Sequence, residues 1–429
     1  MVSAPPDRGG ARVIRPGGRI AARLQAPPSK SATQRALVIA SLARGTSRIL
    51  RPLLGEDGAL LRDALAACGV PITTGVALEV QGGDAARGAG TTLSLGNAGT
   101  AMRFLAARLA IEPDPRLLDG GARMRERPIE ELLAALRLLG MEAEAVRGNG
   151  CPPIRVGGGR PRGGEVRLPG ARSSQFASAL LMSAPRFEAG LSLAIEGEFV
   201  SRPYVRLTAA LMRRFGVEVG QEEQRFVVAA GQDYRPIGLE IEGDWSSASY
   251  HFAAAAIGGG RVEVAGLDQG SAQGDAGILE LLRRMGCRAG TSGDGSIFVE
   301  GPERLSAIEA DLRDMPDLAP TVAILGLFAE GPTRIHGVPH LRLKETDRIA
   351  VLCEGIAALG GSAEPAADGL TVRPRPLAGG TVDPRGDHRM AMAFAVAGLR
   401  VPVVILDPAC VAKSYPGFWD DFDALSRDE

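Results

Sequence analysis

Three lysines are the most unusual chemical feature of this chain, because arginine carries nearly all of its other positive charges. Of the 49 Lys and Arg residues, only Lys30, Lys344 and Lys413 are lysines. An arginine guanidinium stays protonated in proteins, whereas a buried lysine can change its protonation state. The three lysines are therefore candidates for positions where arginine does not serve. A bias in codon usage that leaves three lysines behind is the competing explanation.

The first lysine lies in a polar stretch that predicts an anion site. PPSKSATQR at 27–35 places Lys30 and Ser31 at the start of a helix and Arg35 about one turn further on. A helix N-terminus presents free N–H groups and a partial positive charge, which favour anions. Helix capping alone explains the serines, but it does not explain the cations beside them. The glycine-rich lead of a Walker P-loop is absent.

Two further stretches combine glycine or arginine with a turn. LGNAGTAMR at 95–103 puts Gly99 at a helix start, where the missing side chain lets a ligand approach the backbone. RMRERPI at 123–129 carries three arginines, which suit a bidentate grip on carboxylate and phosphate groups. A solvated charged loop is the alternative interpretation of the second stretch.

Carboxylates stand beside cations in the C-terminal half of the chain. KETDR at 344–348 combines both signs within five residues, Asp317 opens an apolar helix, and DHR occupies 387–389. Two carboxylates among cations can act as a general acid and base. Neighbouring cations lower a carboxylate pKa and burial raises it, and the sequence leaves open which prevails. A surface charge cluster is the alternative for each motif.

The polar clusters recur at a nearly constant interval. Anchored at residues 30, 99, 174, 247, 317 and 388, they lie 69 to 75 residues apart. Each cluster precedes an Ala/Leu-rich run that predicts a helix, then a glycine turn and a β-branched run that predicts a strand. A second type of helix, ending in glycine, is predicted at 61–69, 132–140, 207–216, 278–286 and 351–360. Six repeats of alternating helices and strands indicate an α/β (α+β) fold.

Composition excludes several classes of protein. The chain has 429 residues, which is enough for two to four domains, and a net charge of −1 without a basic block, which argues against nucleic-acid binding. No apolar run is long enough for a transmembrane helix. Residues 1–12 are expected to form a flexible tail rather than a signal peptide. The five cysteines lack a C-x-x-C motif, so reduced thiols in the cytosol are expected.

The motifs together are similar to those of a known family, over residues 13 to 425. The most specific stretches are LGNAGTAMR at 95–103, RMRERPI at 123–129, SSQF at 173–176, GDWSSASY at 243–250, KETDR at 344–348 and DHRMAMAF at 387–394. On these six ordered matches the chain resembles the enolpyruvyl transferases, and among them the members that act on shikimate 3-phosphate.

The resemblance implies a two-domain enolpyruvyl transferase fold, with three βαβαββ units around a pseudo-threefold axis in each domain. Matching positions put residues 13–27 and 243–429 in the first domain and residues 28–242 in the second. The active site would lie in the cleft between the domains, which closes when ligand binds. The resemblance also implies a cytoplasmic monomer with small-molecule substrates, no metal, no organic cofactor, and no nucleic-acid or membrane partner.

The implied reaction transfers the enolpyruvyl group of phosphoenolpyruvate to the 5-hydroxyl of shikimate 3-phosphate and releases phosphate, on the route to chorismate and aromatic amino acids. Asp317 would accept the hydroxyl proton, Glu345 would protonate the methylene carbon, and Lys30 would lie between the substrates. The positions matching a phosphoshikimate contact are Lys30, Ser31, Arg35, Ser173, Ser174, Gln175, Ser201, Tyr204, Asp317 and Lys344. Those matching a phosphoenolpyruvate contact are Lys30, Asn97, Gly99, Arg127, Gln175, Glu345, Arg348, His388, Arg389 and Lys413. All three lysines fall among these positions.

The chain departs from the family pattern at three positions. Pro28 and Phe104 stand where glycine and proline, respectively, are common, and His340 stands where an asparagine often contacts phosphoshikimate. Gly99 is unsubstituted, which predicts sensitivity to glyphosate, a compound that resembles phosphoenolpyruvate.

Two other functions remain as alternatives. A family member that uses UDP-N-acetylglucosamine typically carries a cysteine on the loop that spans 115–127 here, and this chain has none there. A non-catalytic anion-binding paralogue would be expected to lack an acid or a lysine of the site, whereas Lys30, Asp317, Glu345 and Lys413 are all present.

Overall fold

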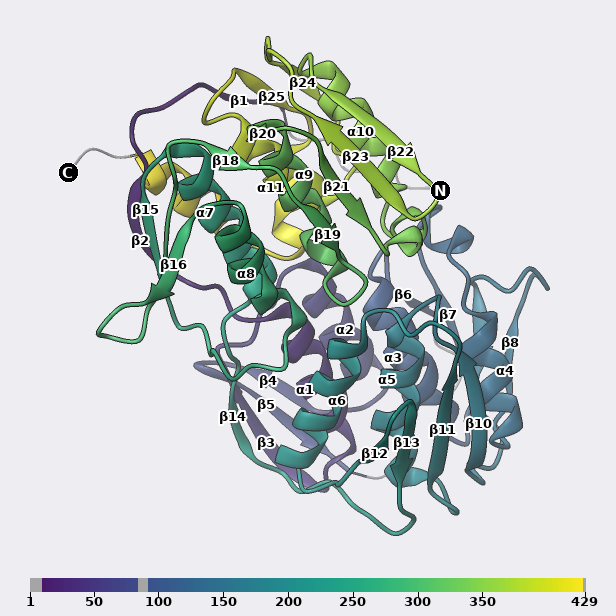
Figure 1. The fold of residues 1–429 in the computed structure, drawn as a ribbon. Coiled ribbons are helices and arrows are strands. Elements are labelled where there is room, and N and C mark those ends of the chain that lie inside the picture. The colour runs from purple at the N-terminus through teal and green to yellow at the C-terminus, as the bar shows by residue number, and fades with distance from the viewer. Residues whose placement is uncertain (1–9, 84–91, 427–429) are drawn as a thin grey trace. The chain divides into compact units, whose positions relative to one another are not determined.

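The computed structural model describes residues 10–83 and 92–426, and the chain divides into two compact units. Unit 1 contains the chain up to Pro27, Gly243–Gln269 and Gly274–Glu429; unit 2 contains Pro28–Glu242 and Gly270–Gln273. Figure 1 traces both units along the chain. The short stretch 270–273 groups with unit 2, whereas the family resemblance places it in the first domain, with residues 243–429.

The predicted N-terminal tail does not extend to Arg12. Residues 1–9 lie outside the described residues, but Arg12 begins a strand, β1 (Arg12–Ile14), and pairs with Ile405. Its guanidinium lies 4.4 Å from the Trp419 ring and 2.5 Å from an Asp423 carboxylate oxygen. These contacts tie Arg12 to the C-terminal end of the chain, so including it in a tail was wrong.

Unit 2 alternates helices with short strands. Its helices are α1 (Lys30–Leu42), α2 (Glu56–Ala67), α3 (Gly99–Ala110), α4 (Glu130–Leu138), α5 (Ser174–Ser183) and α6 (Arg202–Arg214), with 3₁₀ turns η1 (Met124–Glu126) and η2 (Ala184–Arg186). Its strands are β3 (Gly45–Leu50), β4 (Ile72–Thr74), β5 (Ala77–Gly82), β6 (Thr92–Ser94), β7 (Arg116–Asp119), β8 (Ala143–Ala145), β9 (Ile154–Val156), β10 (Gly164–Pro169), β11 (Leu191–Glu196), β12 (Gly220–Glu222), β13 (Arg225–Val228) and β14 (Gly238–Glu240).

Unit 1 repeats the same alternation. Its helices are α7 (Trp245–Gly258), α8 (Ile278–Arg284), α9 (Ala319–Leu327), α10 (Arg348–Ala358), α11 (His388–Ala397) and α12 (Phe418–Asp423), with 3₁₀ turns η3 (Gly274–Gly277), η4 (Pro316–Leu318), η5 (Pro339–Leu343), η6 (Pro408–Lys413) and η7 (Ala424–Ser426). Besides β1, its strands are β2 (Ala21–Gln25), β15 (Arg261–Ala265), β16 (Arg288–Thr291), β17 (Ile297–Glu300), β18 (Leu305–Ser306), β19 (Glu309–Asp311), β20 (Ala329–Glu330), β21 (Thr333–His336), β22 (Ser362–Ala366), β23 (Gly369–Arg373), β24 (Gly380–Val382) and β25 (Val403–Ile405).

The sheets show the sixfold repeat directly. Five four-stranded sheets share one pattern, with one parallel pair followed by two antiparallel pairs, as in β6-β7-β9-β8 and β10-β11-β13-β12. A three-stranded sheet forms the sixth repeat, because β1 pairs antiparallel with β25 in place of a hairpin. Strands β18 and β20 form a separate two-stranded sheet. This pattern confirms the predicted α/β class and its βαβαββ units.

Two strands pair in a different unit from the one that contains the next helix along the chain. Strand β2 precedes α1 in the chain but pairs in parallel with β15 of unit 1. Strand β14 precedes α7 but pairs in parallel with β3 of unit 2. A parallel pair needs a crossover connection, and between β2 and β15 this connection contains all of residues 28–242. The chain therefore changes unit after Pro27 and after Glu242, in addition to the short stretch 270–273.

The helix boundaries confirm both predicted helix types. Six helices begin at or within two residues of the predicted polar clusters. Serine or aspartate side chains cap four of these, because Ser29, Ser173, Asp244 and Asp387 each accept a backbone N–H from the first turn. The helices of the second type end beside glycines with φ between 88° and 96°, a backbone conformation that favours glycine: Gly69, Gly140, Gly216, Gly286 and Gly360.

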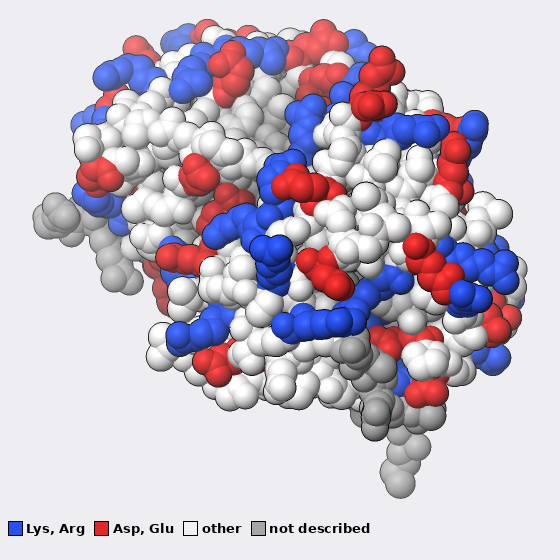
Figure 2. Space-filling model, turned by 90° about the horizontal axis from the view of Figure 1, so that it is seen from below, with Lys and Arg blue, Asp and Glu red and all other residues white. Residues whose placement is uncertain are grey.

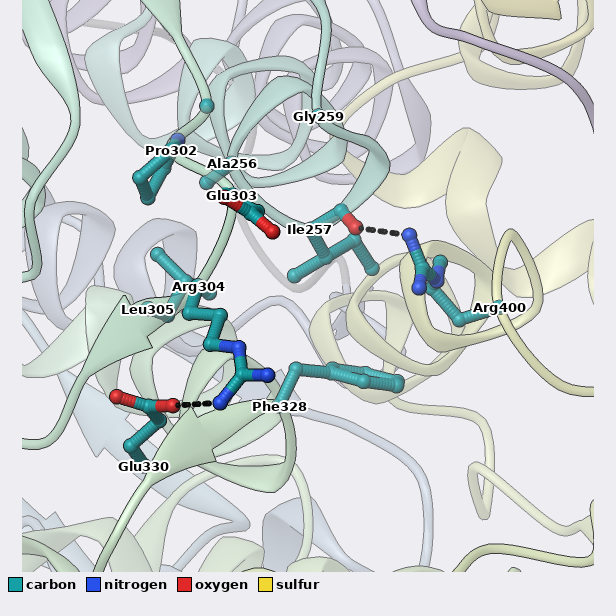
Figure 3. A pocket seen from close by; sticks show the side chains of 11 residues that line it. Ala256, Ile257, Gly259, Pro302, Glu303, Arg304, Leu305, Phe328, Glu330 and Arg400 are labelled. Atoms are coloured by element: carbon teal, nitrogen blue, oxygen red, sulfur yellow. Dashed lines mark hydrogen bonds and ion pairs between the residues drawn. The ribbon is translucent and has the colours of Figure 1, made fainter.

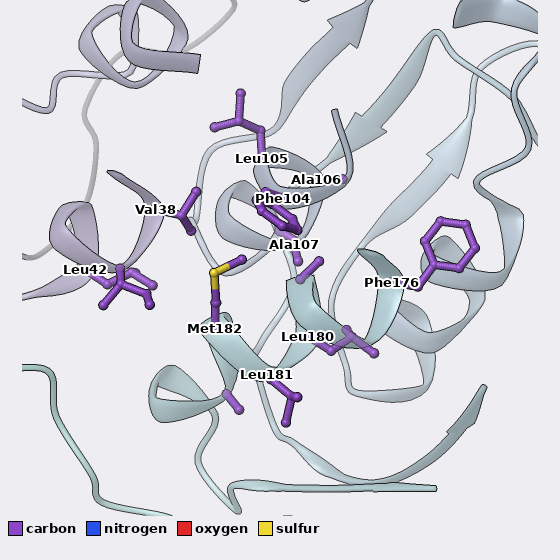
Figure 4. Close-up of a cluster of buried hydrophobic side chains, with 14 of the residues drawn as sticks. Val38, Leu42, Phe104, Leu105, Ala106, Ala107, Phe176, Leu180, Leu181 and Met182 are labelled. Carbon is purple, nitrogen blue, oxygen red and sulfur yellow. The ribbon is translucent and has the colours of Figure 1, made fainter. Parts of the chain in front are cut away.

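Three buried helices lie in the hydrophobic core of unit 2. In Figure 4, side chains from α1, α3 and α5 meet, including Val38, Phe104 and Met182. Nearly every residue of these three helices is buried. A helix that is buried all round is surrounded by other elements, and in unit 2 the sheets and outer helices supply that cover. Helices α7, α9 and α11 are buried in the same way in unit 1.

The surface carries both signs of charge. Figure 2 shows Lys and Arg interspersed with Asp and Glu on one face, with uncharged surface between them. No helix within residues 10–83 and 92–426 is long and apolar enough to cross a membrane.

Candidate active site

The predicted site residues fall into two groups, one in each unit. Unit 2 holds those from Lys30 to Tyr204, and unit 1 holds those from Asp317 to Lys413.

The first lysine of the unit 2 group sits in the first turn of α1. Ser29 caps the helix by accepting the N–H of Ala32. Lys30 Nζ lies 3.2 Å from Asp57 Oδ2 on α2, and the two side chains are 13% and 2% exposed. Asp57 therefore holds the ammonium group at the helix start.

Arg35 is buried and joins three helices. Its guanidinium donates four hydrogen bonds, all to neutral oxygens: the Ser31 carbonyl at 2.9 Å, Thr208 Oγ1 at 2.7 Å, Ser178 Oγ at 3.4 Å and the Tyr204 carbonyl at 3.2 Å. Burial lowers the Arg35 pKa to about 10. No carboxylate among the described residues pairs with it, so the described structure does not neutralise its charge.

A second cation approaches the start of α3. Arg127 Nη1 lies 3.3 Å from Asn97 Oδ1 and 3.4 Å from the Asn97 carbonyl oxygen. A Cβ at Gly99 would lie 2.4 Å from Arg127 Nη2. Gly99 is therefore required so that the guanidinium can lie against the helix start. Arg103, on the next turn, donates to the Gly99 carbonyl at 3.2 Å.

The remaining residues of the unit 2 group lie at the starts of α5 and α6. Ser173 caps α5 by accepting the N–H of Gln175. Gln175 Nε2 donates to Thr100 Oγ1 on α3 at 3.0 Å, so the α3 and α5 starts are linked. Ser201, before α6, has φ 58° and ψ 33°, a strained conformation for a residue other than glycine.

Arg348 is the centre of the unit 1 group. It is 1% exposed, and its guanidinium contacts three carboxylates: Asp317 at 3.0 Å, Glu345 at 2.9 Å and Asp387 at 2.8 Å. Burial disfavours the charge of Arg348, but Asp387, Glu345 and Asp317 outweigh burial and raise its pKa. The ion network thus holds the two predicted proton-transfer residues on one guanidinium.

Asp317 has a second cationic partner. Arg389 Nη2 lies 2.7 Å from Asp317 Oδ2, while Arg348 contacts Oδ1. The side chain of Asp317 remains 17% exposed, and that of Glu345 10%. Both carboxyl groups therefore combine fixed cationic neighbours with residual access, as proton transfer to a bound substrate requires.

Other unit 1 residues are buried close in sequence to these groups. Lys413 is 4% exposed at the end of η6, His388 is fully buried at the start of α11, and Lys344 is half-buried after η5. His340, the departure from the family pattern, is 4% exposed, and neither ring nitrogen has a hydrogen-bond partner within the described chain. Burial and then Lys344 lower the His340 pKa to about 3, so its ring is neutral.

Sequence reasoning missed three carboxylates. Asp57 and Asp387 hold Lys30 and Arg348, respectively. Asp275 accepts a hydrogen bond from Ser246, and burial together with the charge of Asp317 raises its pKa to about 7. Asp387 lies in the DHR motif at 387–389 and directly precedes a predicted helix, a position where aspartate commonly acts as a cap. No comparable pattern in the sequence marks Asp57 or Asp275.

The predicted site residues do not line the cavity that the structure describes in unit 1. That cavity, about 620 Å³, lies in unit 1 at the C-terminal ends of α7 and α9 (Figure 3). Arg400 donates to the Ile257 carbonyl there at 3.0 Å, and Arg304 pairs with Glu330 at 2.8 Å. The predicted site residues of unit 1 instead lie at or before the N-terminal ends of α9, α10 and α11, directly after η5, or at the last residue of η6.

Comparisons with known proteins show the family of the chain. A family model described as EPSP synthase (3-phosphoshikimate 1-carboxyvinyltransferase) matches residues 14–422. The chain belongs to the EPSP synthase family. The chain is therefore an enzyme, a transferase of the shikimate pathway. The comparisons do not favour the alternative in which the acceptor is UDP-N-acetylglucosamine.

Relatives of the EPSP synthase family match over nearly the whole chain. A 3-phosphoshikimate 1-carboxyvinyltransferase of Methanoculleus marisnigri is 42% identical, covering 94% of this chain and 96% of its own. One from Edwardsiella ictaluri is 41% identical, covering 97% and 98%. The solved structure of EPSP synthase from Acinetobacter baumannii superposes with a TM-score of 0.80 at 26% identity, covering 97% and 98%. These matches confirm the predicted fold and family.

Proposed function

We propose that the chain transfers the enolpyruvyl group of phosphoenolpyruvate to the 5-hydroxyl of shikimate 3-phosphate and releases phosphate. The observation that carries the proposal is the buried Arg348, which contacts Asp317 and Glu345 together. A base for the hydroxyl and an acid for the methylene carbon are thereby held by one guanidinium, with Arg389 beside the base.

The unit 2 group would bind the anionic substrates. Arg35 has no carboxylate partner in the described structure, so it is suited to shikimate 3-phosphate, together with Ser31, Tyr204 and the serines at the start of α5. Arg127 and Gly99, at the start of α3, would hold phosphoenolpyruvate, and Lys30 would contact both substrates. Fixed cations stabilise the charge of two anions brought together in one site.

The unit 1 group would carry the proton transfers. Asp317 takes the proton of the 5-hydroxyl as that oxygen bonds to C2 of phosphoenolpyruvate, and Glu345 gives a proton to C3. The resulting tetrahedral intermediate carries both the phosphate and the new ether bond. Loss of phosphate, with return of a C3 proton to Glu345, restores the double bond. Arg348, Arg389 and Lys413 would hold the phosphoenolpyruvate charges, and Lys344 would reach shikimate 3-phosphate.

We further propose that the protein acts as a cytoplasmic monomer without metal or organic cofactor. A monomer is expected to give a mass near 44.6 kDa in light scattering of the purified protein, and a mass of twice that value would contradict it. Activity is expected to be unchanged after treatment with a chelator.

The direct test is phosphate release by the purified protein. We expect release only when shikimate 3-phosphate and phosphoenolpyruvate are both present. Release with UDP-N-acetylglucosamine instead would contradict the proposed acceptor. No release with either acceptor would contradict the proposed activity and favour a binding paralogue.

Gly99→Ala is expected to weaken phosphoenolpyruvate binding. The new Cβ would lie 2.4 Å from Arg127 Nη2, so the guanidinium must move away from the start of α3. Loss of one charge-assisted hydrogen bond corresponds to an increase in the phosphoenolpyruvate KM of about 10- to 100-fold. Steady-state kinetics with varied phosphoenolpyruvate measures this.

The matched control is Gly238→Ala in β14, where a Cβ meets nothing within 4 Å. Its kinetics should match wild type. Glyphosate should compete with phosphoenolpyruvate in wild type, and Gly99→Ala should weaken that inhibition as well. An unchanged KM in Gly99→Ala would contradict the assigned contact, and inhibition that does not depend on phosphoenolpyruvate concentration would contradict the shared site.

A further inference from the structure

A hydrogen-bonded chain links core helix α7 to the segment that carries Lys413. His251 Nε2 lies 2.9 Å from the Tyr415 hydroxyl oxygen, and that hydroxyl donates to Asp421 Oδ2 at 2.6 Å. A tyrosine hydroxyl has a single proton, which here points to the carboxylate. His251 therefore donates its Nε2–H, and the chain runs from α7 through Tyr415 to α12.

Burial determines which ring nitrogen of His251 carries the proton, and therefore the direction of these hydrogen bonds. His251 is 1% exposed, and burial lowers its pKa to about 4, so the ring is neutral near pH 7. Its Nδ1 has no hydrogen-bond partner among the residues that the structure describes. A proton on Nδ1 would be a buried, unpaired donor, which is costly. The Nε2–H form is thus the one that this environment favours.

Tyr415 is tied closely to the backbone of Lys413. Lys413 ends η6, and the next two N–H groups, of Ser414 and Tyr415, both donate to the Val411 carbonyl, at 3.1 and 2.8 Å. Displacement of the Tyr415 ring would therefore move the backbone that carries Lys413.

Helix α12 holds the same segment from the other side. Trp419 Nε1 donates to the Pro408 carbonyl at 2.9 Å, at the start of η6. The Phe418 ring lies 5.6 Å from the Tyr415 ring and 6.3 Å from the His251 ring, which it stacks against. The rings of His251 and Tyr415 also meet edge to face, with centroids 5.7 Å apart. Ring packing keeps the segment in place, and among the described residues the hydrogen bond to His251 Nε2 is the one that joins the Tyr415 hydroxyl to α7.

We propose that His251 is a positioning residue, which acts through Tyr415 to keep Lys413 in place for phosphoenolpyruvate. His251 has no part in the proton transfers described above. The inference rests on the proposed role of Lys413 as a phosphoenolpyruvate contact.

The test uses His251→Phe, which keeps an aromatic ring and removes the donor. We expect faster hydrogen–deuterium exchange in residues 408–416 of the intact protein, measured by mass spectrometry without substrates. We also expect the phosphoenolpyruvate KM to rise about two- to tenfold, as loss of one neutral hydrogen bond implies. The KM for shikimate 3-phosphate and kcat should stay near their wild-type values, because the lost interaction concerns binding of one substrate.

Two variants separate positioning from general destabilisation. His251→Gln offers an amide donor near the place of Nε2 and should restore part of the KM and the slow exchange. Ser249→Ala on the same helix removes a buried hydrogen bond to Thr321, 3.0 Å long, without touching Tyr415. It should leave exchange in 408–416 and the phosphoenolpyruvate KM unchanged.

Each outcome decides the inference. Unchanged exchange at 408–416 in His251→Phe would overturn it. Faster exchange with an unchanged phosphoenolpyruvate KM in an active enzyme would reduce His251 to a structural role and also overturn it. If wild-type protein releases no phosphate, the proposed function fails, while the exchange measurement still shows whether His251 orders this segment.

Discussion

Glu345→Gln is expected to release phosphate about 10²- to 10⁴-fold more slowly than wild type, the range of general acid–base catalysis. The amide keeps the size of the side chain and an oxygen that can accept the Arg348 hydrogen bond, which is 2.9 Å long in the wild type. It cannot give a proton to C3 of phosphoenolpyruvate. The loss should therefore appear in kcat, measured by phosphate release at saturating concentrations of both substrates.

Isotope incorporation tests the assigned role of Glu345. Wild type in D₂O should place deuterium in the methylene group of the product, because a solvent-derived proton enters C3 before another leaves. Glu345→Gln should stop this incorporation. Glu354→Gln, on α10 nine residues further along the chain and paired with Arg385 at the surface, is the matched control and should behave as wild type. Wild-type incorporation in Glu345→Gln would assign the proton donor to another group.

Arg348→Met is expected to lower the free energy of unfolding by about 3–5 kcal/mol, the cost of breaking a buried ion pair from one side. The substitution leaves Asp317, Glu345 and Asp387 without their shared cation, and Asp387 is fully buried. Urea denaturation measures the loss. Phosphate release should fall as well, because Asp317 and Glu345 are no longer held together.

The matched control for Arg348→Met is Arg304→Met in the same unit. Arg304 pairs with Glu330 at 2.8 Å, but both side chains are exposed, so little stability depends on the pair. Its unfolding midpoint should stay within measurement error of wild type. Arg348→Lys retains a charge without the planar fork and should recover only part of the lost stability. Equal midpoints for Arg348→Met and Arg304→Met would show that the buried network contributes nothing.

The periodicity of the sequence was sufficient to predict the helices. Polar clusters about 71 residues apart mark helix starts because serine and aspartate cap free N–H groups, as Ser29 and Asp387 do. Glycines such as Gly69 and Gly216 mark helix ends because their φ values, 89° and 88°, favour a residue without Cβ. Both signals are local, so a single sequence shows them.

Strand pairing across the repeats could not be predicted from local signals. Nothing in residues 21–25 shows that β2 pairs with β15, some 240 residues away, rather than in the unit of the helix that follows it. The resemblance to a family supplied that expectation. Strand β1 was missed for the same reason, because its partner β25 lies near the other end of the chain.

The sequence by itself determined which residue types are available for chemistry: three lysines, arginines at helix starts, and the carboxylates Asp317 and Glu345 among cations. The tertiary structure alone decided how these groups are paired. Arg348 meets Asp317 and Asp387 across 31 and 39 residues, and Arg35 meets Thr208 across 173. Charge pairing and burial depend on distance in space, whereas a sequence records only distance along the chain.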